Sequence, residues 1–124
     1  MTPEELVTYS KNKYIALETY RKNNEAVRTP VWFVIKDDLV YVVTRSQTGK
    51  VKRLKNNQKV KIATCTIKGK ITGQWMQGTA KILTEIETKD AVKWRDKKYG
   101  FMAKIAKFLS KNKGEFFAFS IKID

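Results

Sequence analysis

Short apolar segments alternate with polar turns along most of the chain, which is the pattern of a mainly β protein. Asp37 and Asp38 stand between two such segments and predict a tight hairpin turn. Pro30 lies inside the segment before that turn. Because proline cannot donate to a sheet ladder, we expect that strand at an edge, at a bulge or where something else approaches its backbone. Six strands are predicted in all, over residues 14–20, 27–35, 39–44, 60–66, 71–83 and 115–123.

Two short helices are predicted in the first half of the chain. Thr2 is followed by Pro3 and, three residues after the threonine, by Glu5, which is the pattern of a capping box. That helix is expected to run to about residue 10. A second helix is predicted over residues 50–57, where two apolar residues three apart stand among basic ones.

Two further helices are predicted near the carboxyl end, over residues 88–99 and 101–110, with Gly100 between them. Thr88 is the expected cap of the first, whose apolar side would hold Ala91, Val92 and Trp94. The second is amphipathic, and we expect its apolar face to cover one end of the barrel rather than to lie on a membrane. That face consists of Phe101, Ile105, Phe108 and Leu109.

Strands joined mostly by hairpins, with short helices between them, predict a small six-stranded closed or split β-barrel over residues 1–124, as one domain. Gly73 and Gly78 interrupt the long fifth strand and predict the bends that barrel closure needs. So long a strand is difficult to bury within one small chain, and we therefore expect a homodimer.

Residue types exclude several kinds of site. The chain has no histidine and one cysteine, Cys65, so it offers no Ser-His-Asp or Cys-His pair, no histidine-based metal site and no internal disulfide. We expect Cys65 to be a small buried residue. Any catalysis would then depend on a bound cofactor. A reducing, cytoplasmic location is expected, with no membrane partner, because the chain lacks a secretory signal and a run of about 18 apolar residues.

The formal net charge of +14 favours an anionic ligand. The most informative stretch is Ser46 to Leu54 (SQTGKVKRL), where a strand gives way to polar residues and then to a basic helix. Free N–H groups at a helix start attract anions, and the side chains of Ser46, Thr48, Lys50 and Arg53 add donors and charge. A phosphate site and an ordinary capped surface helix both fit this stretch taken alone.

Two other clusters have a functional and a structural interpretation. Residues 29–33 (TPVWF) could offer their backbone to a flat ring, or they could simply pack in the core. Gln74 and Trp75 lie between Gly73 and Gly78, and these glycines permit either the close approach of a ligand or the curvature of a barrel.

Taken together, these segments resemble the pyridoxamine 5′-phosphate oxidase-like split-barrel family, and within it the short branch that depends on the deazaflavin coenzyme F-420. The resemblance runs from about residue 14 to residue 123 and is carried by YIALETYR, TPVWFV, LVYVVT, SQTGKVKRLKNN, GQWMQGTAKIL and KKYGFMAKIAKFL. Gln58 and Gln74 stand where related sequences often have proline.

The resemblance implies a homodimer with two cofactor sites at its interface. It implies that Thr29, Pro30, Val31 and Trp32 lie along the cofactor ring. It implies that the phosphate is held by Thr44, Ser46, Lys50, Val51 and Arg53. Gln74 and Trp75 would help to line the site, from either subunit, and Lys52 is expected to point to solvent.

The leading hypothesis is therefore an oxidoreductase that uses coenzyme F-420 to move a hydride to or from a small organic substrate. No side chain is assigned as a catalytic acid or base. FMN binding within the same fold is the alternative, as is a cofactor carrier without catalysis. A nucleic-acid-binding barrel, with lysines along the phosphates and tryptophans stacked on bases, is a more remote alternative.

Overall fold

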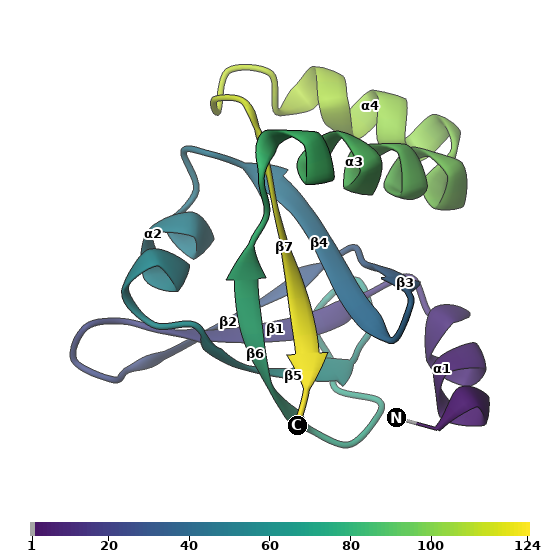
Figure 1. The fold of residues 1–124 in the computed structure, drawn as a ribbon, viewed down its shortest axis with the longest axis vertical. Coiled ribbons are helices and arrows are strands. Elements are labelled where there is room, and N and C mark those ends of the chain that lie inside the picture. The colour runs from purple at the N-terminus through teal and green to yellow at the C-terminus, as the bar shows by residue number, and fades with distance from the viewer. Residues whose placement is uncertain (1) are drawn as a thin grey trace.

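The computed structural model describes residues 2–124, which form one curled antiparallel sheet of seven strands with four helices around it (Figure 1). The order across the sheet is β2-β1-β5-β6-β7-β4-β3. The strands are β1 Ile15–Tyr20, β2 Ala26–Val31, β3 Val34–Lys36, β4 Leu39–Arg45, β5 Lys59–Thr64, β6 Met76–Ile82 and β7 Phe116–Ile123. The prediction of a mainly β split barrel is confirmed.

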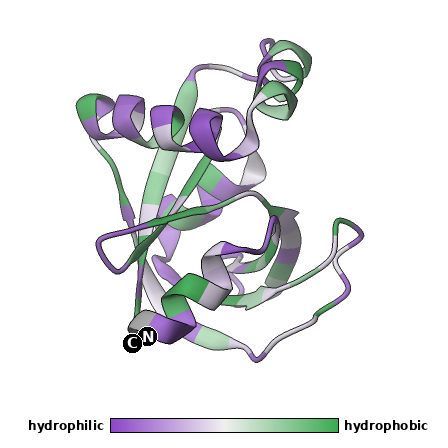
Figure 2. Ribbon diagram, turned by 90° about the vertical axis from the view of Figure 1, so that its right-hand side faces the viewer, coloured by the Kyte–Doolittle hydropathy of each residue, from purple (hydrophilic) through white to green (hydrophobic). Residues whose placement is uncertain are grey.

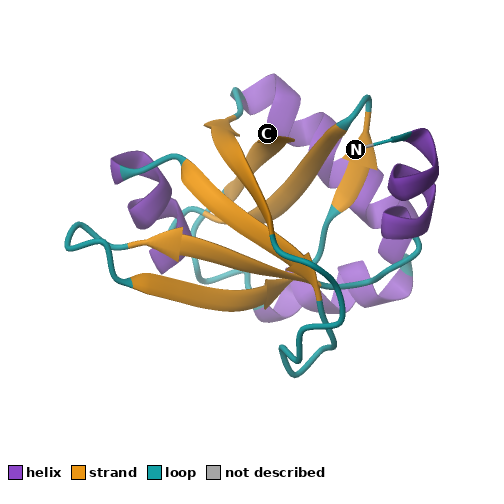
Figure 3. Cartoon of the chain, turned by 90° about the horizontal axis from the view of Figure 1, so that it is seen from below, coloured by secondary structure: helices purple, strands orange, loops and turns teal. Residues whose placement is uncertain are grey.

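The prediction of one strand over residues 27–35 is wrong, because this segment forms two strands, β2 and β3, at opposite edges of the sheet. β2 pairs only with β1, whereas β3 pairs only with β4 at the opposite edge. Only Trp32 and Phe33 separate the two strands. The sheet therefore curls until its two edges meet at a covalent link, which accounts for seven strands where six were expected (Figure 3).

Two features of these edges were predicted correctly. Pro30 lies in the edge strand β2, where its missing N–H breaks no second ladder. Asp37 and Asp38 form the turn between β3 and β4, with φ values of 50° and 65°. Positive φ at both central residues is typical of the tightest hairpin turns, and aspartate tolerates it better than most residues.

The strand β6 begins at Met76, later than predicted, and residues 71–75 form a loop joined to the sheet by one bridge between Cys65 and Ile71. Gly78 lies where β6 meets β7. A Cβ atom on it would stand 2.7 Å from the Lys122 carbonyl oxygen, so the two strands approach too closely there for any side chain.

Cys65 is buried, as expected, and burial raises the pKa of its thiol.

The helices are α1 Pro3–Ser10, α2 Gly49–Asn56, α3 Glu85–Tyr99 and α4 Phe101–Leu109. The Thr2 hydroxyl accepts the Glu5 N–H at 3.1 Å, as the predicted cap requires. In contrast, α3 starts earlier than predicted, since Thr84 and Glu87 form its capping box. Thr88 is not the cap but lies on the buried side with Ala91, Arg95 and Tyr99. No helix in residues 2–124 has the length and apolar character needed to cross a membrane.

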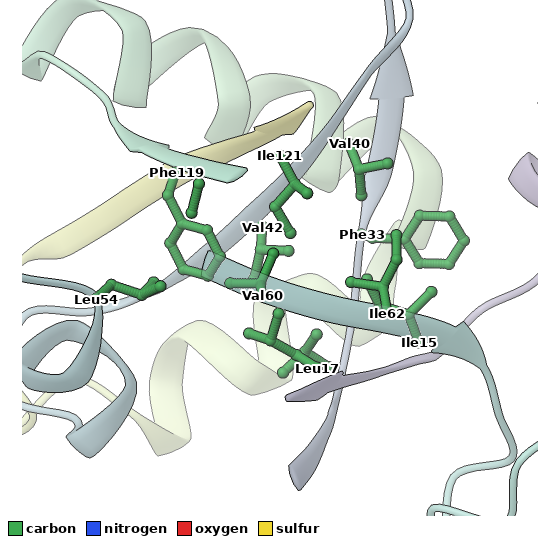
Figure 4. Packing of buried hydrophobic residues seen from close by; sticks show 12 residues of the cluster. Ile15, Leu17, Phe33, Val40, Val42, Leu54, Val60, Ile62, Phe119 and Ile121 are labelled. Carbon is green, nitrogen blue, oxygen red and sulfur yellow. The ribbon is translucent and has the colours of Figure 1, made fainter. Parts of the chain in front are cut away.

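The apolar face of α4 does not cover the barrel as expected. Ala103 is its buried residue, whereas Phe101 and Leu109 are each 74% exposed. The core instead fills the inside of the curled sheet, where side chains from most strands meet the buried Leu54 of α2 (Figure 4). Its members are Ile15, Leu17, Val31, Phe33, Val40, Val42, Leu54, Val60, Ile62, Ala80, Phe119 and Ile121.

Tyr99, at the end of α3, satisfies the backbone where β2 gives way to β3. Its hydroxyl accepts the Phe33 N–H at 3.0 Å and lies 2.7 Å from the Lys13 carbonyl oxygen, to which it donates. Its ring stacks on Trp32, with centroids 4.3 Å apart and planes at 7°. The Lys98 ammonium donates to the Phe33 carbonyl at 2.9 Å. The backbone N–H and carbonyl of Phe33 therefore keep hydrogen bonds where the chain leaves the sheet.

Replacing Tyr99 by phenylalanine should lower the free energy of unfolding by about 1 to 3 kcal/mol, because the buried Phe33 N–H would lose its acceptor. The stacking on Trp32 would remain. Tyr41→Phe is the matched control, since that ring contacts Trp94 and no hydrogen bond of its hydroxyl is found within residues 2–124. Urea denaturation measures both variants. An equal, small change in the two would show that the Tyr99 hydroxyl contributes little.

Lys98 predicts a pH dependence of stability. Burial lowers the pKa of its ammonium to about 8, so between pH 8 and the usual lysine value the folded chain has lost a proton that the unfolded chain still binds. Stability from this group should therefore rise with pH across that range. Comparing the wild type with Lys98→Met at about pH 7 and pH 9.5 by urea denaturation isolates it. A difference between the two proteins that stays constant with pH would contradict the assignment.

Candidate functional site

The loop from β4 to α2 is held against the start of β7. The Ser46 N–H donates to the Glu115 carbonyl at 2.8 Å, and the Gln47 N–H donates to the Lys113 carbonyl at 3.0 Å. Gly114, between these two acceptors, has φ of 91°, and a Cβ atom there would collide with the Ser46 hydroxyl. A glycine is therefore required, and the loop has one fixed position.

The first turn of α2 lacks a side-chain cap. Its N-cap residue, Thr48, accepts no capping hydrogen bond, and its hydroxyl donates to the Arg45 carbonyl at 3.1 Å. The Thr44 hydroxyl lies 3.4 Å from that of Thr48. The N–H groups of the first turn, which have no partner inside any helix, are thus available to another acceptor.

Two cationic side chains of α2 gather at this same turn. The Arg53 guanidinium folds back toward the helix start, where its Nη1 lies 2.7 Å from the position that a Cβ atom on Gly49 would take. Its Nε donates to the buried Thr19 hydroxyl at 2.6 Å. Lys50 is half-buried beside it, and desolvation, followed by repulsion from Arg53 and Lys113, lowers the pKa of its ammonium.

This cluster of positive charge is not paired with any carboxylate of the described residues. No ion pair among residues 2–124 includes Lys50, Arg53 or Lys113. Desolvation and then the nearby Arg21 also lower the pKa of Arg53. Like charges held together without a carboxylate destabilise one another, and a bound anion would relieve that repulsion. Such an anion would also meet the free N–H groups of the first turn.

Three contributors to this cluster were not predicted. Lys113 and Gly114 are distant in sequence and reach the loop only because β7 pairs with β4. Thr19 meets Arg53 through the packing of α2 on β1. None of these contacts has a local signal in the sequence.

The segment predicted to meet a ring, residues 29–32, occupies the end of β2 and the start of the link to β3. Thr29 is half-buried, Pro30 is exposed, and Val31 is buried in the core. Trp32 is half-buried with one face against Tyr99. Because β2 pairs with β1 alone, alternate backbone groups of β2 point away from the sheet.

The positive cluster and this segment lie along the same pair of strands. Arg53 contacts Thr19, whose partner across the ladder is Val27 on β2. Thr29 to Trp32 follow two to five residues farther along the chain, which corresponds to about 7 to 17 Å at the rise of an extended strand. An elongated ligand with its anion at α2 could therefore extend along β2.

Two residues of the predicted site, Gln74 and Trp75, lie away from α2 of the same chain. Trp75 stacks on the Arg28 guanidinium at 4.8 Å, and Arg28 in turn donates to Glu18 at 2.8 Å. Glu18 follows Leu17 and precedes Thr19, so this group lies on the outer face of β1, opposite to Arg53. Gln74 lines a cavity of about 510 Å³ with residues of α1, which Figures 1 and 3 show on the other side of the molecule from α2.

The other two α2 residues considered in the sequence analysis, Val51 and Lys52, lie on different faces of the helix, one buried and one exposed. Val51 is buried against the core, so its side chain cannot contact a ligand at the helix start, although its N–H group can. Lys52 is exposed and points to solvent, as expected.

The fold recurs in solved structures of low sequence identity. A protein of the pyridoxinephosphate oxidase family from Clostridium acetobutylicum is 20% identical, with a TM-score of 0.67 over 97% of this chain and 80% of that chain. A heme storage protein from Vibrio cholerae is 14% identical, with a TM-score of 0.73 over 98% and 89%. An FAD-binding protein from Mesorhizobium loti is 16% identical, with a TM-score of 0.66 over 100% and 89%.

No curated protein sequence is significantly similar to this chain. The sequence pattern of the family described as "Pyridoxamine 5'-phosphate oxidase" nevertheless matches residues 1–124, which is the full length given. The curled sheet, the edge strand with its proline and the basic helix after β4 agree with that match. The chain therefore belongs to the pyridoxamine 5′-phosphate oxidase family of split-barrel proteins.

Proposed function

We propose that this chain binds a flavin-type cofactor and places its phosphate at the start of α2. The observation that carries the proposal is the cluster of Lys50, Arg53 and Lys113, which no carboxylate of residues 2–124 pairs, beside an uncapped helix start. A phosphate fits both the charge and the donors. Membership of a family that usually binds flavins supports the same conclusion.

Residues 29–32 would provide the surface along which the cofactor ring packs. The outward backbone groups of β2 can donate to and accept from the polar edge of a ring, and the half-buried Trp32 is already fixed by its stacking on Tyr99. Such a cofactor supplies hydride transfer when bound, to or from a small organic substrate. The protein's contribution is to fix the position and to match the charge, and no side chain is assigned as an acid or base.

A homodimer would complete the site. Gln74 and Trp75 lie away from α2 in their own chain, so if they line the cofactor they must come from the partner subunit. The unpaired edge of β2 and the outer face around Trp75 are the surfaces that a second copy would bring together. This arrangement would give two sites related by a twofold axis.

Charge favours coenzyme F-420 over FMN. The deazaflavin carries an acidic tail beyond its phosphate, and Lys113, which has no ion pair among residues 2–124, adds positive charge near Lys50 and Arg53. FMN would use the phosphate anchor alone. Absorbance separates them, because the deazaflavin absorbs at shorter wavelength than the yellow flavin.

Lys50→Glu combined with Arg53→Glu should weaken cofactor binding by about 100-fold or more, since two charge-assisted contacts would be lost and two repulsive charges added. Titration of purified protein with F-420 and with FMN, followed by cofactor fluorescence, measures the change. Lys52→Glu combined with Lys55→Glu is the matched control, because it changes the same charge on exposed residues of the same helix.

The control should bind within about threefold of the wild type. An equal loss in both double variants would mean that only the overall field matters, as in a nucleic-acid-binding protein. Failure of both cofactors to bind the wild type at micromolar concentration would contradict the proposed function. Binding without turnover of any candidate substrate would indicate a carrier.

The origin of Gln74 and Trp75 can be tested by complementation. Gln74→Ala combined with Trp75→Ala should also impair cofactor binding. In a heterodimer of this variant with Lys50→Glu/Arg53→Glu, one of the two sites should have no substituted residue and the other should have all four. Unfolding and refolding an equal mixture of this variant with Lys50→Glu/Arg53→Glu should restore about a quarter of the sites if each site uses both subunits of a twofold dimer. No restoration in verified heterodimers would place all these residues in one subunit's site.

A further inference from the structure

The helix α4 presents its largest apolar side chains to solvent. Phe101 and Leu109 are each 74% exposed, and Phe108 is 65% exposed. Met102 and Ile105, at 44% and 45%, complete the strip. In the hydropathy colouring of Figure 2, this helix is largely green beside the mostly purple α3. Few soluble monomers expose so many large apolar side chains on one short helix.

The side of α4 that faces the protein is small and firmly held. Ala103 is buried and Ala106 is half-buried, so the helix rests on methyl groups. Arg45 fixes its carboxyl end: the guanidinium donates to the Lys107 carbonyl at 3.2 Å, the Ser110 hydroxyl at 3.0 Å and the Gly114 carbonyl at 3.3 Å. Turning the apolar strip inward would break these bonds. The strip is therefore a fixed outer surface.

Positive charge borders this strip. Residues 101–114 contain four lysines and no aspartate or glutamate. Lys104 and Lys111 lie along one flank of the helix, and the Lys111 ammonium lies 4.5 Å from the centroid of the Phe108 ring. Lys107, between them in sequence, pairs with Asp96 of α3 at 3.7 Å. Long lysine side chains can follow an apolar surface while their ammonium groups stay in water. The surface thus combines an apolar strip with an adjoining row of cations.

That combination restricts what can cover the strip. A second copy of the chain would bring two identical rows of lysines together in a chain that already carries a net charge of +14. The helix is also only nine residues long, about 14 Å, which is short for a stable helix-to-helix dimer contact. An anionic lipid surface has neither difficulty, because its acyl chains accept the apolar strip and its phosphates accept the lysines.

We propose that α4 docks this protein on the surface of an anionic phospholipid membrane, with Phe101, Ile105, Phe108 and Leu109 inserted and the flanking lysines at the headgroups. The helix would lie in the interface and would not cross the bilayer. The sequence alone favoured a barrel cap over this role, and the exposure of the strip reverses that preference. The proposal is independent of the cofactor and concerns a different face of α4 from the one that meets the barrel.

Vesicle flotation tests the proposal on the full chain without cofactor. Vesicles of phosphatidylcholine with phosphatidylglycerol should bind the protein, and vesicles of phosphatidylcholine alone should bind it far less. Phe101→Ser/Phe108→Ser/Leu109→Ser should weaken binding by about tenfold or more, and because these residues are exposed the fold should be retained. Lys104→Gln/Lys111→Gln should weaken it by about tenfold, whereas the control Lys52→Gln/Lys55→Gln should change it by less than about threefold.

Undiminished binding of the triple serine variant would overturn the proposal. So would a loss confined to the lysine variant, since charge without insertion is the mark of general polyanion binding. Light scattering measures the oligomeric state of the wild type and the triple variant, and so tests whether a second copy of the chain covers the strip instead. A dimer that becomes a monomer in the triple variant, with no vesicle binding by either protein, would assign the strip to a second copy and reject the lipid surface.

Discussion

The barrel depends on satisfying the backbone at one place, where two residues connect opposite edges of the sheet. Phe33 has left the ladder of β2 and has not yet entered that of β3, so its N–H and carbonyl need partners from elsewhere. Tyr99 and Lys98 provide them from the end of α3, and the tyrosine ring holds Trp32 by stacking. Because the link is covalent, the sheet can curl and close without pairing its edge strands.

The positive cluster at α2 is a consequence of the same topology. The pairing of β4 with β7 brings the residues before β7 against the loop after β4, so Lys113 joins Lys50 and Arg53 although the sequence separates them widely. The curl also places the edge strand β2 beyond Thr19, the contact of Arg53 on β1. A charged anchor and a free strand edge are thus aligned by the sheet and not by any local motif.

Sequence reasoning succeeded where the signal was local. The alternation of apolar residues, the turn at Asp37 and Asp38 and the edge position of Pro30 are all properties of neighbouring residues, and all are confirmed. It failed where tertiary contacts decide. The change of edge at Trp32 depends on Tyr99, and the start of α3 depends on Glu87 reaching Thr84 instead of on an apolar repeat. The apolar face of α4 gave the right helix but the wrong environment, since periodicity shows which residues share a face and not what covers it.

The position of β7 in the sheet has a consequence for biosynthesis. The hairpin of β3 and β4 is joined to the rest of the sheet by hydrogen bonds to β7 alone, and β7 is formed by residues 116–123. While a ribosome is still making this segment, the emerging chain has two separate sheet fragments with exposed inner edges, joined through the link at Trp32 and through the segment that contains α2. Assembly of the sheet must therefore wait until residue 123 has been released from the exit tunnel, and a chaperone would find its longest opportunity before that moment.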